Sequence, residues 1–298
     1  MKKQPWNCMI LAAFLGSFLL AGSVLAVDVM EGNAKAPPPG LNGFMATYVN
    51  VDVGDQYVDS QKQGFGHTTH IEQLLLRYTR TFSIADNPAV FYVQPSFGKV
   101  SGRGILANQP GTEGMGDTAF AFAYWPYANH QAGDYLALVG YLVAPTGEYD
   151  SSQIPNLSLG QDRYKAAFQL GYQTAINDKL DAMFVVDAMW HEDIDAVKTL
   201  TSTVKLEQDT LYSSQLSLMY KPSAQYLLGA SYIISKGGEK TYDGVAQNDA
   251  ADNSRYQLTA RGRFSFGELI FQYGGDIDVE NGFFIDNKAM LRYQLVWK

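Results

Sequence analysis

The sequence predicts an all-β protein: a transmembrane antiparallel β-barrel of about 12 strands. Three observations support this fold class. The N-terminus has the pattern of an export signal, no second long apolar run follows it, and apolar residues alternate with polar ones through residues 41–298. A helical membrane protein is excluded because each spanning helix needs about 20 consecutive apolar residues. Alternation gives each strand one apolar and one polar face, which suits a barrel with lipid outside and water inside.

Residues 1–26 resemble a secretory signal peptide. Two lysines precede an apolar run over residues 9–25, and small residues predict cleavage after Ala26. An uncleaved membrane anchor is the alternative, but the run is short for a spanning helix and glycines interrupt it. The single cysteine, Cys8, lies inside the signal, so the mature chain has no disulfide. We expect a proline-rich periplasmic N-terminal segment at 27–40 and the barrel at 41–298.

The charge balance is acidic. The chain has 30 Asp and Glu against 22 Lys and Arg, and its pI is near 5.0. Loss of the two signal lysines makes the mature chain more acidic still. An acidic chain is a poor match for a nucleic-acid phosphate backbone, so we expect no nucleic acid among its partners.

Strand phase is clearest near the C-terminus. Tyr256, Leu258 and Phe264 share one face of a strand, and Arg261 and Arg263 share the other. Because an unpaired arginine is costly in a dry core, the arginine face is expected to line a wet lumen. The last strand follows the same rule, with Trp297 outward. We expect strands near 42–53, 68–83, 89–99, 116–126, 134–147, 162–176, 179–191, 206–221, 224–236, 252–266, 268–280 and 283–297.

The connections between these strands alternate between long and short, as in outer-membrane barrels with long extracellular loops and short periplasmic turns. The exception is the last connection, a tight hairpin around residues 281–282 on the long-loop side. A soluble β-sandwich is the alternative, since it also alternates. The export signal and the charged residues opposite apolar ones weigh against it. So do the aromatic residues at strand ends, such as Trp125, Trp190 and Trp297.

The inward-facing ionisable residues are the best functional signal. They include more basic than acidic groups although the whole chain is acidic. One interpretation is a pore that meets an anion or a polarised phenolic oxygen; the other is a lumen filled by salt-bridged side chains. The candidate lumen residues are Arg77, Lys165, Asp187, Arg261, Arg263 and Arg292.

Other chemical signals are weaker, and we expect no cofactor and no metal. His67 and His70 are three apart, which places them on opposite faces of an extended segment. The acidic loops 192–195 and 243–252 match no ion-binding spacing. His191 and Asp187 share a strand face, as a general base pair requires, but no Gly-x-Ser-x-Gly motif supplies a nucleophile. We therefore expect no enzyme.

Several motifs together resemble the family of the MetA pathway of phenol degradation. They are a proline run ending in glycine, a Met-Gly-Asp strand start, an Ala-Pro-Thr-Gly-Glu-Tyr-Asp strand end and a following Asn-Leu pair with glycine. The resemblance implies an outer-membrane barrel linked to uptake of aromatic compounds. One departure is Lys298 after Trp297, because such barrels usually end in an aromatic residue. The motif positions are Pro38, Pro39, Gly40, Gly116, Asp117, Pro145, Thr146, Gly147, Tyr149, Asn156 and Gly160.

These observations predict a passive channel in the cell outer membrane for small hydrophobic or aromatic, phenol-like compounds. A structural or nonspecific barrel with a filled lumen is the first alternative, and an outer-membrane lipid hydrolase is the second. The expected partners are outer-membrane lipid and lipopolysaccharide, the barrel assembly machinery and the solute itself.

Overall fold

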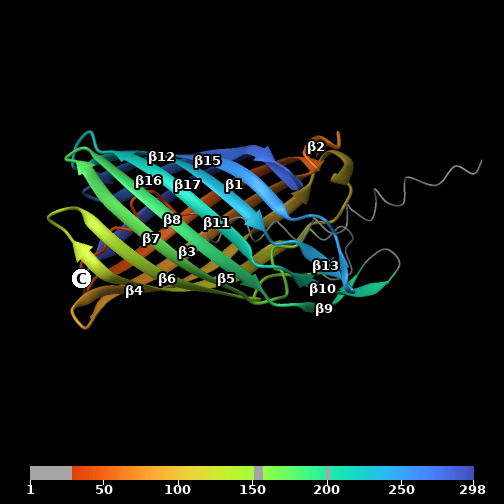
Figure 1. Ribbon diagram of the computed structural model, residues 1–298, viewed down its shortest axis with the longest axis horizontal. Coiled ribbons are helices and arrows are strands. Elements are labelled where there is room, and N and C mark those ends of the chain that lie inside the picture. Colours follow the sequence, from red (N-terminus) through yellow and green to blue (C-terminus); the bar gives the residue numbers. More distant parts are fainter. Residues whose placement is uncertain (1–28, 151–156, 199–201) are drawn as a thin grey trace, which may run out of the picture.

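The computed structural model describes residues 29–150, 157–198 and 202–298. The expected signal peptide and Asn156 lie outside these residues. Twelve long antiparallel strands follow one another around a barrel, which closes because β17 pairs with β1 (Figure 1). The barrel strands are β1 (Asn42–Val58), β3 (Thr69–Ile84), β4 (Asn87–Gly102), β5 (Glu113–Asn129), β6 (Asp134–Ala144), β7 (Lys165–Asn177), β8 (Leu180–His191), β11 (Leu211–Tyr220), β12 (Tyr226–Gly237), β15 (Ala251–Phe264), β16 (Gly267–Val279) and β17 (Gly282–Trp297).

The predicted closed barrel and the number of its strands are confirmed. Several predicted boundaries differ from the structure; β1, for example, continues five residues beyond the expected end at 53, and two other differences have a clear local cause. The strand expected at 206–221 divides into β10 (Thr203–Gln208) and β11, and Asp209 between them donates its N–H to the carbonyl of Glu239. The strand expected at 134–147 ends at Ala144, because the next residue, Pro145, has no N–H for the ladder. Among the described residues, no helix is long and apolar enough to cross a membrane.

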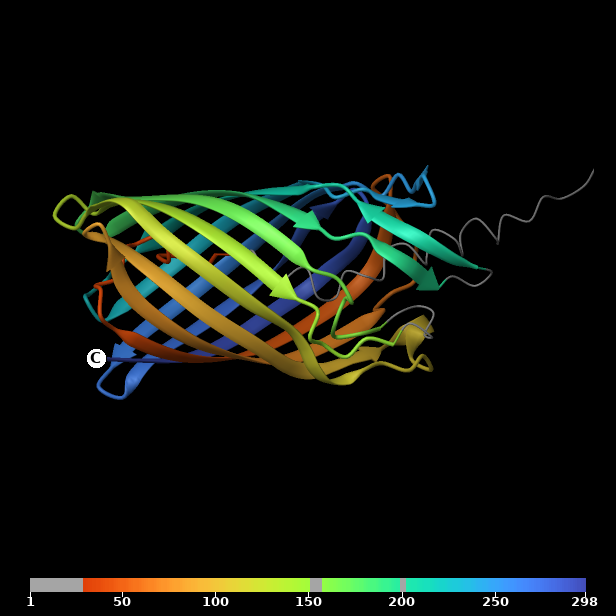
Figure 2. The same ribbon diagram turned by 90° about the horizontal axis from the view of Figure 1, so that it is seen from below.

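The two ends of the barrel differ. Five short turns lie at one end, here called the short-turn end. The longer connections lie at the opposite, long-loop end, together with the tight turn between β16 and β17. At the long-loop end, β9 (Ile194–Lys198), β10, β13 (Lys240–Tyr242) and β14 (Val245–Ala246) form a small sheet beyond the barrel wall (Figure 2). The two-residue strand β2 (Gln61–Lys62) pairs with β1 at the same end. Loops were expected at β9, β13 and β14, and only the end of β10 falls within a predicted strand.

The predicted strand phase is confirmed on β15. Leu258 is 50% exposed on the outer face, whereas its neighbours Gln257 and Thr259 are buried inside. Other large apolar residues, such as Phe44 and Trp297, are also exposed. In water such exposure would be costly; against lipid it is the expected arrangement, because the hydrocarbon core has no hydrogen-bonding partners for polar groups.

Trp125 departs from the prediction. It was expected among the aromatic residues at strand ends, but it is only 4% exposed and points into the barrel. It shares the inner face of β5 with the buried Ala121 and Ala123, so two-residue alternation along the strand places its side chain inside. The indole Nε1 donates a hydrogen bond of 2.7 Å to the carbonyl of Ala34. Trp125 therefore holds the N-terminal segment.

The N-terminal segment, residues 29–41, lies inside the barrel near its short-turn end (red in Figure 1). A proline-rich periplasmic segment was expected at 27–40, and its sequence alone does not decide whether it enters the lumen. Ala34 packs against Met183 and Leu227 of the barrel wall, which explains the apolar Leu227 on the inner face of β12. The segment leaves the lumen beside Thr81, whose hydroxyl donates to Pro38 at 2.8 Å and whose carbonyl accepts the Gly40 N–H at 3.0 Å.

Candidate functional site: the barrel lumen

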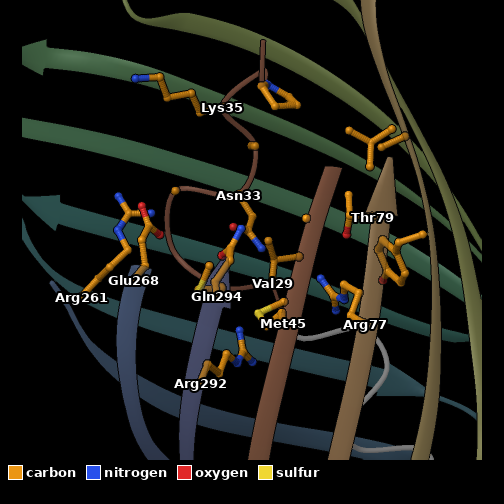
Figure 3. Close-up of a pocket in the computed structure, with 18 of the residues that line it drawn as sticks. Val29, Asn33, Lys35, Met45, Arg77, Thr79, Arg261, Glu268, Arg292 and Gln294 are labelled. Carbon is orange, nitrogen blue, oxygen red and sulfur yellow. The ribbon is translucent and has the colours of Figure 1, made fainter. Parts of the chain in front are cut away.

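A cavity of about 1210 Å³ lies between the N-terminal segment and the barrel wall (Figure 3). Drug-sized ligands occupy pockets of roughly 300–1,000 Å³, so the cavity has room for a small solute beside the segment. Its lining contains apolar, polar and charged groups, and basic side chains outnumber acidic ones by eight to four. The basic residues are Lys35, Arg77, Lys179, Lys221, Arg261, Arg263, Lys288 and Arg292, and the acidic ones are Asp117, Asp178, Asp181 and Glu268.

Four of the six candidate lumen residues line this cavity: Arg77, Arg261, Arg263 and Arg292. Strand alternation found them because β3, β15 and β17 run regularly through this region. Lys165 and Asp187 are also on inner faces, in phase with the cavity residues Gln169 and Val185, but they do not border the cavity. Asp187 instead accepts a hydrogen bond of 2.9 Å from the hydroxyl of Ser213 on the next strand.

Arg77 is held by residues that were not among the candidates predicted from the sequence. Its Nε donates a hydrogen bond of 2.7 Å to Gln94 Oε1, and its guanidinium carbon lies 4.0 Å from the centre of the Tyr92 ring. The Tyr141 ring meets Tyr92 edge-on at 6.5 Å, and the Tyr141 hydroxyl donates to Gln169 at 3.0 Å. Such stacking fixes the plane of a guanidinium. Alternation on β4 and β6 places these residues inside, but only the strand register shows that they meet.

The other cavity arginines differ in their partners. Arg263 forms an ion pair with Glu268 near the short-turn end. Arg261 lies beside the same carboxylate in Figure 3, but no ion pair within 4.0 Å joins the two among the described residues. Arg292 on β17 donates to the sulfur of Met290 at 3.5 Å. Basic groups thus follow the wall from β15 through β17 to β3 (Figure 3).

A second basic cluster lies towards the long-loop end. Lys165 begins β7 opposite His191 of β8, and the charges of Arg163, Lys165 and Lys240 all act on the His191 ring. Arg163 is 2% exposed; its Nη2 donates to Gln208 at 2.5 Å, and burial lowers its pKa to about 10. Lys240 is paired with Asp249 at 3.0 Å. Arg163 was not among the candidates, although it falls in the strand expected at 162–176 and alternates in phase with Lys165; in the structure it lies in the connection just before β7.

The family motif fastens the connection between β6 and β7 across the barrel mouth. One carboxylate oxygen of Asp117 accepts the Gly147 N–H and the other accepts the Gln161 N–H, each at 3.1 Å. Thr146 donates to the hydroxyl of Thr118 at 2.8 Å. Leu157 and Leu159 of this connection are buried in a core with β1, β3 and β4 residues, and Tyr149 packs under the small sheet. The connection therefore folds inward at the long-loop end.

Gly147 lies where the β6–β7 connection packs too closely against its neighbours to admit a side chain. A Cβ atom there would lie 2.7 Å from the backbone N of Asp117 and 2.8 Å from the Cα of Gly160. We expect Gly147→Ala to displace the connection and to lower the free energy of unfolding by about 1–3 kcal/mol, the usual cost of overpacking. Gly140→Ala on β6 is the control, because a Cβ at Gly140 meets nothing within 4 Å. Equal unfolding midpoints in urea for the two variants would contradict the packing argument.

Glu31 anchors the N-terminal segment from the lumen side. Its carboxylate is completely buried and accepts hydrogen bonds from Ser231 at 2.5 Å, from Gln257 at 3.2 Å and from Thr259. Gln272 donates to it at 3.3 Å. These partners come from three neighbouring strands, β12, β15 and β16, which lie 200 to 241 residues further along the chain. No sequence signal in the segment itself identified this contact.

The histidines and acidic loop residues that were weaker candidates in the sequence form structural contacts. His67 and His70 bind different carboxylates, Asp286 at 2.8 Å and Asp52 at 2.7 Å. The acidic loop residues Asp193, Asp249 and Asp252 each pair with a lysine, and the Glu192 carboxylate accepts the Tyr164 N–H. Hydrogen bonds to Glu207 and Asp193 raise the pKa of Lys205. In the described part of the chain, no three His, Cys, Asp or Glu side chains form a group suited to a metal ion.

A closed antiparallel barrel with an apolar exterior and a charged lumen is the architecture of channels in bacterial outer membranes. The sequence matches the family described as the MetA-pathway of phenol degradation over residues 47–293, and the chain belongs to that family. No curated protein matches the sequence.

Among solved structures, an outer membrane channel from Pseudomonas putida F1 is similar, with a TM-score of 0.85 and 28% identity. The match covers 91% of this chain and 100% of that one. The β domain of the Bordetella autotransporter Brka has a TM-score of 0.51 at 12% identity, covering 87% of this chain and 100% of its own, and shares the fold alone. The protein is thus an outer membrane β-barrel channel, a class that is not enzymatic.

Proposed function

We propose that the protein is a passive channel for small hydrophobic or aromatic, phenol-like compounds. The observation that carries the proposal is the lumen cavity of about 1210 Å³, whose lining places apolar residues such as Val90, Val139 and Leu75 beside a few fixed polar groups. Ligand sites for apolar molecules have this composition. The family's description in terms of phenol degradation supports the same solute class. On this proposal Arg77, Lys165, Asp187, Arg261, Arg263 and Arg292 contact or steer the solute.

An uptake assay tests the proposal. Cells that produce the protein should take up radiolabelled phenol and naphthalene faster than matched cells without it, because lipopolysaccharide slows the passage of hydrophobic molecules. Uptake of arabinose should be unchanged. Equal aromatic uptake in the two strains, with the barrel present in the outer membrane fraction, would refute the proposal.

A structural barrel with a filled lumen is the second candidate. It is favoured by the N-terminal segment and by the inward-folded β6–β7 connection, which occupy the lumen from opposite ends. Conductance in planar bilayers separates the two candidates, because a filled lumen passes no ions. A conductance that is lost on adding an aromatic solute would support the channel.

The orientation in the membrane follows from the connections. The long-loop end is proposed to be extracellular and the short-turn end periplasmic, as in other barrels of this class. Cysteines introduced at Asn108 and Gln247 should react with a membrane-impermeant maleimide on intact cells, whereas one at Ser223 should react only after lysis. Because Cys8 lies in the expected signal peptide, cleavage after Ala26 leaves no competing thiol. If only the cysteine at position 223 reacted on intact cells, the barrel would have the opposite orientation in the membrane.

The other proposed partners are those that would contact the outer surface of the barrel. The exposed apolar band is proposed to contact outer-membrane lipid and, at the long-loop end, lipopolysaccharide. The assembly machinery is proposed to recognise the last strand through Trp297, which is 46% exposed, with Lys298 as a tolerated extra residue.

A further inference from the structure

The charge of the lumen cavity is opposite to that of the chain. The chain has 30 acidic and 22 basic residues, yet basic side chains predominate in the cavity lining. When a cavity has a low-dielectric wall and its charged groups are mostly of one sign, it attracts and concentrates ions of the opposite sign. The cavity combines an apolar wall with basic groups, and this combination fits a solute that has a hydrophobic body and an anionic end.

Arg77 is the group best prepared to bind such an end. Gln94 Oε1 accepts a hydrogen bond from its Nε–H and the Tyr92 ring supports its plane, which leaves the two terminal nitrogens to donate. Within the described part of the chain, no carboxylate lies within ion-pair distance of Arg77. The acidic residue of the N-terminal segment, Glu31, is bound elsewhere, by Ser231 and Thr259. A planar carboxylate matches a guanidinium edge with two parallel hydrogen bonds.

The surroundings of Arg77 suit an aromatic ring. Leu75 lies two residues before it on the same face of β3, and Val90 lies two residues before Tyr92 on β4. Leu75, Val90 and Tyr92 all line the cavity. Figure 3 shows the Arg77 side chain pointing towards the space beside Val29 and Met45. A ring can therefore rest on aliphatic side chains while its carboxylate meets the guanidinium.

We propose that Arg77 is the anchor of an anion-binding site in the lumen and that this site takes small aromatic carboxylates. This proposal names a solute class for the proposed channel. It rests on the proposed function only for the direction of solute flow. Arg292 on β17 and Arg261 on β15 extend the basic wall towards the short-turn end and favour movement of the anion along it.

Equilibrium binding to the purified mature protein tests the site, with sodium benzoate and its neutral isostere benzamide as probes in titration calorimetry. Benzoate should bind to the wild-type protein about ten-fold or more tightly than benzamide, since charged hydrogen bonds are worth that much. Arg77→Met should weaken benzoate binding by a similar factor and leave benzamide unchanged. Arg77→Lys should recover only part of the loss, because an ammonium cannot form the planar fork.

Arg80→Met is the matched control. It removes the same charge three residues along β3, but Arg80 is exposed on the outer face and donates to Asn42 at 3.0 Å. It should bind benzoate as the wild type does. Equal affinity for the two probes, or an unchanged benzoate affinity in Arg77→Met, would overturn the inference. The comparison of probes on the wild-type protein needs no substitution, so it remains decisive if a variant fails to assemble. Loss of neutral aromatic uptake in cells would instead refute the proposed function.

Discussion

Replacing Glu31 by alanine is expected to release the N-terminal segment from the lumen and to raise the single-channel conductance. The substitution removes a buried carboxylate that accepts hydrogen bonds from Ser231, Gln257, Thr259 and Gln272. Hydrogen bonds to a charged group contribute about 1.5–3 kcal/mol each and are not additive. A loss of about 3 kcal/mol corresponds to roughly a hundred-fold shift in the docking equilibrium.

The measurement is conductance of the purified protein in planar bilayers, with circular dichroism as a check on the barrel. Asn33→Ala is the control, because this exposed side chain lies in the same segment and has no hydrogen bond within the described residues. Trp125 still holds the Ala34 carbonyl in the Glu31 variant, so partial rather than complete opening is expected. If Glu31→Ala conducts as the wild type does, the carboxylate does not keep the segment docked.

The contrast between Glu31 and Arg261 shows what the sequence can predict. Arg261 was placed in the lumen because alternation within one strand fixes the direction of each side chain. Glu31 has no such pattern around it. Its partners lie 200 to 241 residues away in the sequence, and only folding of the barrel brings them to it. Local periodicity therefore predicts which face a residue occupies, but not which distant residue it meets.

Errors in the predicted elements have a similar physical origin. Trp125 was grouped with the aromatic residues at strand ends by its position in the sequence, although its alternation with Ala121 and Ala123 places it on the inner face of β5. The small sheet was missed because its strands have two to six residues, too few for alternation to stand out. In the candidate site, Arg77 was predicted, whereas its support by Tyr92 and Gln94 depends on which strands are neighbours.

Leu258→Arg is expected to impair assembly of the barrel. Leu258 lies on the outer face of β15, between Ala230 of β12 and Tyr273 of β16, and is 50% exposed. An arginine that faces lipid near the bilayer midplane costs about 2–4 kcal/mol. The free energy of folding into lipid vesicles, measured by urea titration, should fall by that amount. The heat-modifiable folded band should also weaken in cells.

Two substitutions on the same strand and its turn separate this cost from a general intolerance of change. Arg261→Leu alters the lumen face and should leave folding nearly intact, since lumen substitutions affect selectivity more than insertion. Phe266→Arg introduces the same charge on the outside but in the short turn after β15, where the cost falls to about 0–1 kcal/mol near the interface. The expected order of folding free energies therefore places Leu258→Arg well below the other two. If all three variants fold equally well, the outer face of β15 does not meet the hydrocarbon core at Leu258.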